Sequence, residues 1–446
     1  MHRYCPAAVA LFVSAVAFAG CSTADSTAGH AARHADNAKT GNVIFVHPDG
    51  ASAATYVALR NIDVGPDGDL NWDKLPAMAL YRGHMRNSLT ATSNGGATAH
   101  AYGVKPWHDA FGMTGGPEPQ LITDDAVRSR SVAHQAMRHG LSVGLVQSGV
   151  SVEPGTAAFL TSVEKRAMHD AIAAQLIESG ADVLLSGGER DFLPRGAPGF
   201  HGPGTRQDNR NLTDEAVAAG YDVVYTLDQL RALPDDVDKV LGLFAHASTF
   251  NDKPEEVLAE QGLPLYDPDA PTLAEMTEHA LRILSAKDRR FLLVIEEEGT
   301  DNFGNNNNAG GVIEAARRAD ETFGLCMGFI DDRPDTLLLT CADSDGGGMR
   351  VIGYPKGAAP DAVAARARNG SPQDGINGAE TPPFTAAPDR FGQRLKFRVA
   401  WSAFSDVSGG VLVRGSGLNS DRIHGSFDNT DVPELIRLTL FGATEP

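Results

Sequence analysis

The chain beyond residue 40 repeats one pattern: a short apolar run, a polar turn and a stretch with helical periodicity. The apolar runs are continuous rather than alternating, which indicates strands buried on both faces. Such strands are typical of a mostly parallel sheet, so we expect a doubly wound α/β fold with helices on both faces. The predicted strands are Val43–Val46, Leu141–Val146, Val183–Leu185, Val240–Phe244, Phe291–Ile295 and Leu337–Leu339.

Two further segments stand out in this pattern. Residues 272–287 keep an apolar stripe at helical spacing, and Thr272 with Glu275 forms a capping-box signature, so we predict a helix there. Residues 194–235 open with several prolines and glycines that break the rhythm. We interpret them as an irregular surface insertion within a single catalytic domain that covers residues 42–446.

The first residues have the features of an export signal. Arg3 precedes a short apolar stretch, Ala7–Ala19, and small residues stand directly before Cys21, which resembles a lipoprotein signal. We therefore expect residues 1–21 to be the signal and Cys21 to carry lipid, which would place the protein in the periplasm or at the cell surface. An ordinary cleaved signal is the alternative. Residues 22–41 are polar and small, as in a flexible tether.

Charge narrows the range of partners. The formal net charge is −19, which disfavours nucleic acid and anionic membrane surfaces. A small anionic substrate would need cations in its site. The folded part holds Cys326 and Cys341, and their spacing alone leaves a disulfide open.

Acidic residues follow four of the predicted strands, where reactive groups gather in open α/β sheets. A single acidic strand end is most often a solvated loop. Several carboxylates meeting at one sheet edge would repel one another unless cations lay among them, so we infer a site for several metal ions. The residues are Asp49, then Glu153, then Glu296, Glu297, Glu298 and Asp301, and finally Asp343 and Asp345.

Residues 90–105 have a polar start followed by small residues that predict a helix, which puts Ser93 near the N-terminus of that helix. A serine at this place has free backbone N–H groups nearby, which favour an anion or a forming alkoxide. Alone, this feature is equally consistent with a serine that caps a helix.

Taken in order, these motifs resemble the alkaline phosphatase family. The resemblance covers roughly residues 42–442 and rests on the order in which its motifs appear, none sufficient alone. The matching segments are Asp49-Gly50, Ser93 with Ala97–Ala99 and Gly103–Lys105, Ala157–Phe159, Leu185–Pro194, Pro271–Met276, Glu296–Asp301, Ala342-Asp343 and Asp431–Pro433.

The resemblance implies a role for each matching residue. Ser93 would be the nucleophile, which forms a phosphoserine that water then hydrolyses, and Asp49 would bridge metals beside it. Asp301 and Asp343 would hold the two catalytic metals.

Three more residues match the family pattern. Glu153 and Glu296 would hold a third, supporting metal. Arg166, thirteen residues after Glu153, would bind the phosphate through its planar guanidinium. A surface arginine on a helix is the alternative for Arg166.

The departures from the family concern the metal ligands. Asn305 and Ser344 stand where the family has histidines, and His424 is the one histidine near the expected place of the last zinc ligand. The threonine expected at the third metal falls on Gly155. His47, two residues before Asp49, would point the same way as Asp49 in a strand.

Oxygen ligands in place of imidazoles change the expected metals. Carboxylate, amide and hydroxyl oxygens suit Mg²⁺, Ca²⁺ or Mn²⁺, whereas zinc more often has nitrogen or thiolate ligands. We therefore expect two to three divalent ions, mainly of the harder kind, with Zn²⁺ left open.

The leading functional prediction is hydrolysis of small phosphate monoesters. The alternatives are a phosphodiesterase of the same superfamily and a non-catalytic lipoprotein that binds phosphate or metal. A sulfatase fits poorly, because its distinctive motif is absent around Ser93. The resemblance also implies that a homodimer could form, although no segment argues for one independently.

Overall fold

The computed structural model describes residues 39–353, 363, 366 and 370–442. The predicted signal, the cysteine expected to carry lipid and nearly all of the predicted tether lie outside these residues. No helix among the described residues is both long and apolar enough to cross a membrane.

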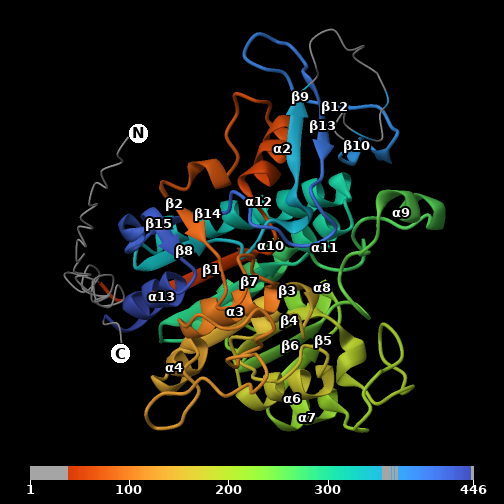
Figure 1. Ribbon diagram of the computed structural model, residues 1–446. Helices are drawn as coiled ribbons and strands as arrows, with labels where there is room; N and C mark the ends of the chain where they lie inside the picture. The colour runs from red at the N-terminus through yellow and green to blue at the C-terminus, as the bar shows by residue number, and fades with distance from the viewer. Residues whose placement is uncertain (1–38, 354–362, 364–365, 367–369, 443–446) are drawn as a thin grey trace, which may run out of the picture.

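A ten-stranded sheet forms the centre of the molecule (Figure 1). Only β14 runs against its neighbours, β2 and β8, while every other pairing in the sheet is parallel. In spatial order the strands are β15 (His424–Asp428), β2 (Ala77–Arg82), β14 (Leu412–Gly417), β8 (Thr336–Thr340), β1 (Asn42–Pro48), β7 (Phe291–Glu297), β3 (Ser142–Val150), β4 (Val183–Gly187), β6 (Lys239–Leu243) and β5 (Tyr221–Val224).

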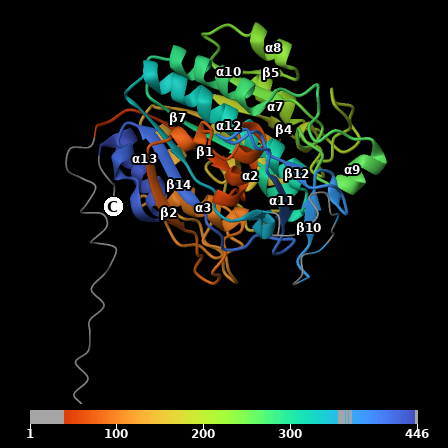
Figure 2. The same cartoon turned by 90° about the horizontal axis from the view of Figure 1, so that it is seen from above.

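Helices cover both faces of this sheet, which confirms the predicted fold class. Helices α10 and α12 contact one face (Figure 2), whereas α4 and α13 contact strands from the other (Figure 1). The helices are α2 (Ala53–Asp63), α3 (Ser93–Tyr102), α4 (Val132–Arg138), α5 (Pro154–Ala157), α6 (His169–Ser179), α7 (Leu212–Ala218), α8 (Leu227–Ala232), α9 (Glu255–Gln261), α10 (Leu273–Ala286), α11 (Gly299–Asn305), α12 (Ala309–Asp332) and α13 (Asp431–Phe441).

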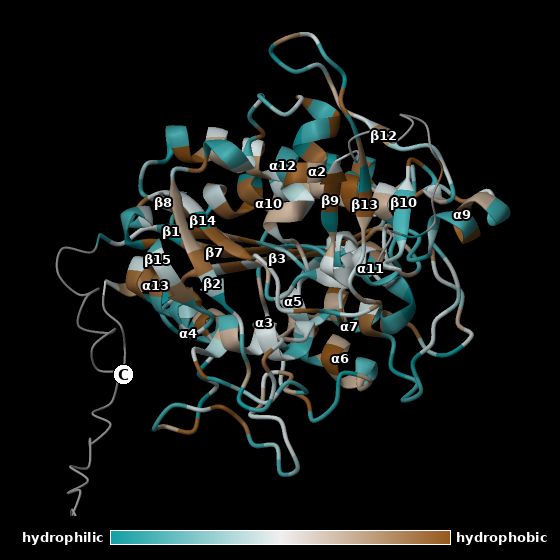
Figure 3. Ribbon diagram, turned by 45° about the horizontal axis from the view of Figure 1, so that its top comes forward, coloured by the Kyte–Doolittle hydropathy of each residue, from teal (hydrophilic) through white to brown (hydrophobic). Residues whose placement is uncertain are grey.

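The central strands are buried because both of their faces are covered. Every residue of β1, β3, β4, β7 and β8 is buried, and the hydrophobic colouring concentrates on these strands (Figure 3). All six predicted strands are present. The predicted helix is α10, which begins after Thr272, and the capping box between Thr272 and Glu275 has formed.

A small antiparallel sheet stands beside α2, at the top of Figure 1. Its central strand is β13 (Lys396–Ala400), which pairs with β9 (Arg350–Gly353), β10 (Gln373–Gly375) and β12 (Phe384–Thr385). The two-residue strand β11 (Gly378–Ala379) pairs with β10. The chain returns from this sheet to the central one through residues 401–411.

Two details differ from, or add to, the sequence-based picture. The segment 194–235 is irregular only in its first part, because residues 212–232 form α7, β5 and α8, and β5 becomes an edge strand of the main sheet. The prolines and glycines that suggested an insertion all lie before residue 205.

Cys326 and Cys341 are both buried and free, so they form no disulfide in this structure.

Candidate metal and active site

Acidic side chains gather at the carboxyl ends of four adjacent strands, β8, β1, β7 and β3. Asp49 follows β1, and its backbone N–H donates to the Glu297 carbonyl at 3.1 Å, which ties the ends of β1 and β7 together. Glu298 and Asp301 come directly after β7, and Asp343 comes after β8. Parallel pairing therefore brings these residues to one edge, as the sequence predicted for the strand ends.

Ser93 is the first residue of α3 and is only 4% exposed. The helix begins here because the Thr92 side chain accepts a hydrogen bond from Gly95 N–H. Gly96, one turn on, rests against Asp343 so closely that a Cβ there would overlap the carboxylate. The small residues of α3 thus let Ser93 approach the acidic cluster.

Asp49 lies at the centre of the cluster and is fully buried. Burial alone would raise its pKa, but His47 beside it, with smaller contributions from Asp343 and Ser93, lowers the pKa below its usual range. Neither Asp49 oxygen has a well-formed hydrogen bond. An ionised and unpartnered carboxylate next to Ser93 is a strong site for a cation.

The carboxylates around Asp49 are buried without partners that would compensate their charge. Burial is the main cause that raises the pKa of Asp301, Asp343 and Glu298 well above the usual range, and neighbouring carboxylates add to it. Both oxygens of Glu298 and of Asp343 lack a hydrogen bond, as does the Ser344 hydroxyl. One oxygen each of Asp49, Glu298 and Asp301 lie within 4.8 Å of one another. Divalent cations fit this arrangement, because its carboxylates carry more negative charge than His47 and Arg166 can offset.

Asp301 has a second carboxylate beside it, Asp406, in the loop after β13. The Asn305 amide nitrogen donates to both Asp301 oxygens, at 3.1 and 3.0 Å, and to Asp406 Oδ1 at 3.0 Å. Asn305 Oδ1 accepts from Gly347 N–H at 3.0 Å. The partly positive NH₂ group therefore sits among three carboxylate oxygens, a place that also suits a cation.

Arg166 reaches the cluster from the loop before α6 and forms an ion pair with Glu153. Burial alone would lower the pKa of Arg166, but the charges of Glu153, Glu298 and Asp49 outweigh burial and raise the pKa above its usual value. The guanidinium therefore lies in the field of the cluster. Its side chain remains 41% exposed, which leaves it accessible to a ligand from solvent.

Glu296, on β7, lies beside Gly155. A Cβ at Gly155 would overlap Glu296 Oε1, so the threonine of the family pattern has no room here. The neighbouring Thr156 hydroxyl instead accepts from the Gln147 amide at 3.3 Å.

The prediction for His424 does not fit the structure. His424 is exposed at the start of the edge strand β15, four strands away from β1. Because β15 runs in the same direction as β8 and β1, its first residue lies at the edge of the sheet opposite the carboxylates. The carboxylate of Asp406 lies at the cluster instead.

Sequence reasoning missed Asp406 for a physical reason. It precedes β14, which is antiparallel, so the beginning of β14 lies at the same edge as the ends of its parallel neighbours. Reciprocal backbone hydrogen bonds of 3.1 Å between Asp345 and Val407 hold the loop in place. The sequence signal for Asp406 is an acid just before a strand, whereas the family pattern predicts a histidine as the last metal ligand.

Comparison with known proteins now adds to this picture. The alkaline phosphatase family matches residues 40–377, more than half of the chain. The fold and the buried carboxylates define a hydrolase of the metal-binding kind, and the chain belongs to the alkaline phosphatase family.

Individual relatives are distant. The chain is 28% identical to the alkaline phosphatase of Gadus morhua over 339 residues, which are 68% of this chain and 69% of the relative. It is 26% identical to alkaline phosphatase 4 of Bacillus subtilis over 358 residues, 78% of this chain and 70% of the relative.

Solved structures show the same fold. The alkaline phosphatase of Thermus thermophilus superposes with a TM-score of 0.70 and 22% identity over 92% of this chain and 93% of its own. The alkaline phosphatase of the Antarctic bacterium TAB5 superposes with a TM-score of 0.67 and 18% identity over 91% of this chain and 99% of its own.

Proposed function

We propose that this protein hydrolyses small phosphate monoesters through a phosphoserine formed on Ser93. The observation that carries the proposal is the position of Ser93 at the start of α3, buried beside the unpartnered carboxylates of Asp49 and Asp343. A hydroxyl among carboxylates alone would be a poor nucleophile. The same hydroxyl beside bound divalent cations becomes a good one.

Three groups of residues would hold the cations. Asp301, Asn305 and Asp406 form one group, and Asp343, Ser344 and Asp49 form the second. Glu296 and Asp49, with Glu153 nearby, would form the third group, which corresponds to the third metal position of the family. Bound there, divalent cations neutralise the carboxylates and polarise the oxygens of the phosphoryl group and of the nucleophile.

The chain's own residues then account for the reaction. The Arg166 guanidinium leaves its ion pair with Glu153 and binds two phosphoryl oxygens. Ser93 Oγ forms a bond to phosphorus while the bond to the leaving alcohol oxygen breaks. Water then breaks the bond between Ser93 and phosphorus, which frees inorganic phosphate and restores the hydroxyl. The N–H groups at the start of α3 face the negative charge in both steps.

The oxygen-rich ligands favour Mg²⁺, Ca²⁺ or Mn²⁺ in the first two groups. Asp406 and Ser344 offer only oxygen to a metal, and Asp301, Asp343 and Asp49 complete the groups. Asn305 would offer oxygen only after its amide turns, because its Oδ1 accepts from Gly347 N–H and its NH₂ group faces the carboxylates.

Export and anchoring are part of the same proposal. Lipid on Cys21 would hold the catalytic domain at a membrane surface outside the cytoplasm, with phosphate esters as substrates and no nucleic-acid partner; a homodimer stays open. Mass spectrometry of the mature protein tests the anchor. An unmodified N-terminus downstream of Cys21 would contradict it.

A substrate panel tests the proposed reaction. The full chain, stripped of metal and refilled with Mg²⁺, Ca²⁺, Mn²⁺ or Zn²⁺ in turn, is assayed with an aryl phosphate, an aryl phosphodiester and an aryl sulfate. We expect the monoester to react fastest. A faster diester would make the protein a phosphodiesterase, and no turnover with any metal would support the non-catalytic alternative.

A further inference from the structure

We propose that His47 supplies a nitrogen ligand at the third metal position, so that His47, Asp49 and Glu296 form a buried site for one ion of the zinc class. One ligand atom of each residue lies within 4.8 Å of those of the other two. All three side chains are fully buried. The proposal concerns binding alone, so it stands whether or not the protein turns over phosphate esters.

The orientation of His47 is fixed by its other nitrogen. Nδ1 lies 3.0 Å from the Cys341 carbonyl oxygen, an acceptor, so Nδ1 must carry the hydrogen. In the neutral ring Nε2 then presents a lone pair. A metal-binding histidine is typically held in this way, with its second nitrogen bonded to a carbonyl or a carboxylate.

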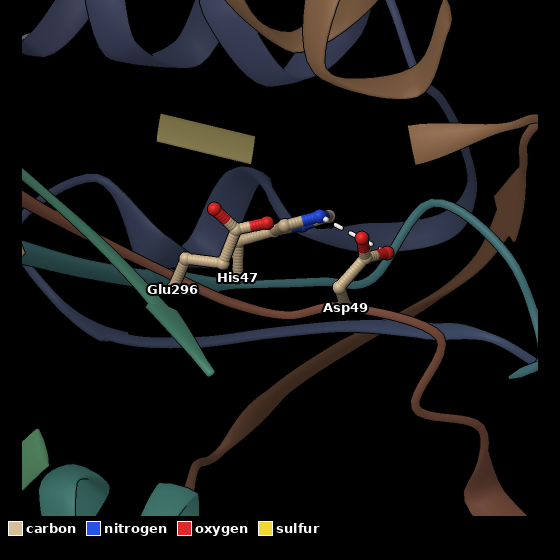
Figure 4. A group of neighbouring side chains, drawn as sticks. All are labelled: His47, Asp49 and Glu296. Carbon is tan, nitrogen blue, oxygen red and sulfur yellow. Dashed lines mark ion pairs between the residues drawn. The ribbon is translucent and has the colours of Figure 1, made fainter. Parts of the chain in front are cut away.

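The free nitrogen points at a carboxylate (Figure 4). His47 Nε2 lies 3.5 Å from Asp49 Oδ1, and neither atom has a hydrogen bond of good geometry. Two ligands of a tetrahedral zinc ion, each about 2.1 Å from it, are about 3.4 Å apart. The two atoms are thus already at the separation that a shared ion requires.

Glu296 contributes in the same manner. The Gln147 amide donates to Glu296 Oε2, which leaves Oε1 buried without a partner. The absence of a side chain at Gly155 makes room for Oε1. His47 and Glu296 are also direct partners in the pairing of β1 with β7. Each of the two residues therefore has one ligand atom held by the protein and one left free.

The chemistry of this set differs from that of the neighbouring cluster. One imidazole with two carboxylates suits Zn²⁺ and similar ions, whereas Asp301, Asn305 and Asp406 offer only oxygens. Two kinds of ion would then lie side by side. The opposing possibility is that His47 is protonated and balances the two carboxylates itself, in which case the set binds no metal.

Zinc content separates these possibilities. The full chain is stripped with chelator, incubated with Zn²⁺ in excess Mg²⁺, passed through gel filtration and measured by elemental analysis. We expect His47→Gln to retain about one Zn²⁺ per chain fewer than the wild type, with zinc affinity at least about 10-fold lower. His100→Gln is the matched control, since His100 is also buried and lies 5.4 Å from the His47 ring, but its Nε2 bonds the Tyr81 hydroxyl at 2.7 Å. We expect it to retain zinc as the wild type does.

X-ray absorption at the zinc edge of the wild type gives an answer that does not depend on the variants folding. Imidazole scattering with nitrogen about 2.0–2.1 Å from zinc is expected. Zinc bound only by oxygen, or equal zinc content in His47→Gln and wild type, would overturn the proposal.

Discussion

Asp301 and Asp406 face each other across the Asn305 amide, whose nitrogen lies 3.0–3.1 Å from oxygens of both carboxylates. One aspartate follows a parallel strand and the other precedes an antiparallel strand, more than 100 residues later in the chain. The Asp301 carboxylate is buried and that of Asp406 is half-buried, and two carboxylates this close would repel each other in a protein that bound no cation. The pair therefore marks a place in the site where a cation would be stabilised.

Asp406→Asn removes one of these two charges. We expect the Mg²⁺ concentration for half-maximal activity to rise at least about 10-fold, the scale seen when the surroundings of a metal are perturbed. Activity titrated with Mg²⁺ measures the change. Asp421→Asn, at an exposed aspartate, is the control. Equal titrations for Asp406→Asn and wild type would remove Asp406 from the site.

Gly155→Thr restores the residue type of the family and is expected to destabilise the protein and weaken its metal binding. Its Cβ would overlap Glu296 Oε1. Overpacking of this kind costs about 1–3 kcal/mol, so the thermal midpoint should fall and metal bound near Glu296 should be lost. Calorimetry and elemental analysis measure both effects. Gly328→Ala, at an exposed glycine of α12 with nothing within 4 Å of the added Cβ, should keep or raise the midpoint.

Stability of the metal-stripped protein should fall with rising pH. Burial and the Asp49 charge raise the pKa of Glu296 to about 8, against the effect of His47, and burial raises those of Asp301, Asp343 and Glu298. An acid with a higher pKa in the folded state favours folding while it is protonated, and this contribution disappears as the pH passes its folded pKa. The Glu296 contribution is fully present below the ordinary pKa of 4.5 and is lost as the pH rises to about 8, so the thermal midpoint should drop across that range.

Bound Mg²⁺ should reduce that drop, because it stabilises the ionised carboxylates. Glu255 lies outside the cluster, and burial raises its pKa to about 8 as well. It therefore makes stability fall with rising pH both with and without Mg²⁺. The informative quantity is thus the difference between the curves with and without Mg²⁺. Parallel curves would mean that the buried carboxylates do not bind the ion.

Arg166→Lys tests how the phosphate is held. Lysine keeps the charge but loses the paired N–H groups, so the inhibition constant of inorganic phosphate should rise by about 10-fold. The same rise is expected in KM, with a smaller effect on kcat. Lys165→Ala, at the exposed neighbouring cation, should leave both constants unchanged. An unchanged inhibition constant in Arg166→Lys would show that Arg166 only pairs with Glu153.

The sequence predicted the central strands and the acidic edge because both follow from local patterns. Continuous apolar runs such as Phe291–Ile295 mark buried strands, and the acids after them must meet when the strands are parallel. Asp406 could not be found in this way, because the direction of β14 is a property of the whole sheet. The pairing of residues 221–224 as an edge strand was hidden for a similar reason, since its alternating, half-buried pattern is weak.

Ser93→Ala should reduce turnover of an aryl phosphate by about 10³-fold or more, as expected when a nucleophile is lost. The thermal midpoint and the metal content should stay near those of the wild type, because Thr92 still caps α3 and no carboxylate is changed. A variant that keeps its activity would mean that another group, or water directly, attacks the phosphate.

The most direct test of the phosphoserine mechanism is to identify the phosphorylated residue itself. The metal-loaded full chain is mixed with an aryl phosphate, quenched with acid during turnover, digested and examined by mass spectrometry. The mechanism predicts phosphate on Ser93, in the peptide that begins α3, and none in Ser93→Ala. Phosphate on a different residue, or rapid turnover with no phosphorylated peptide, would contradict it.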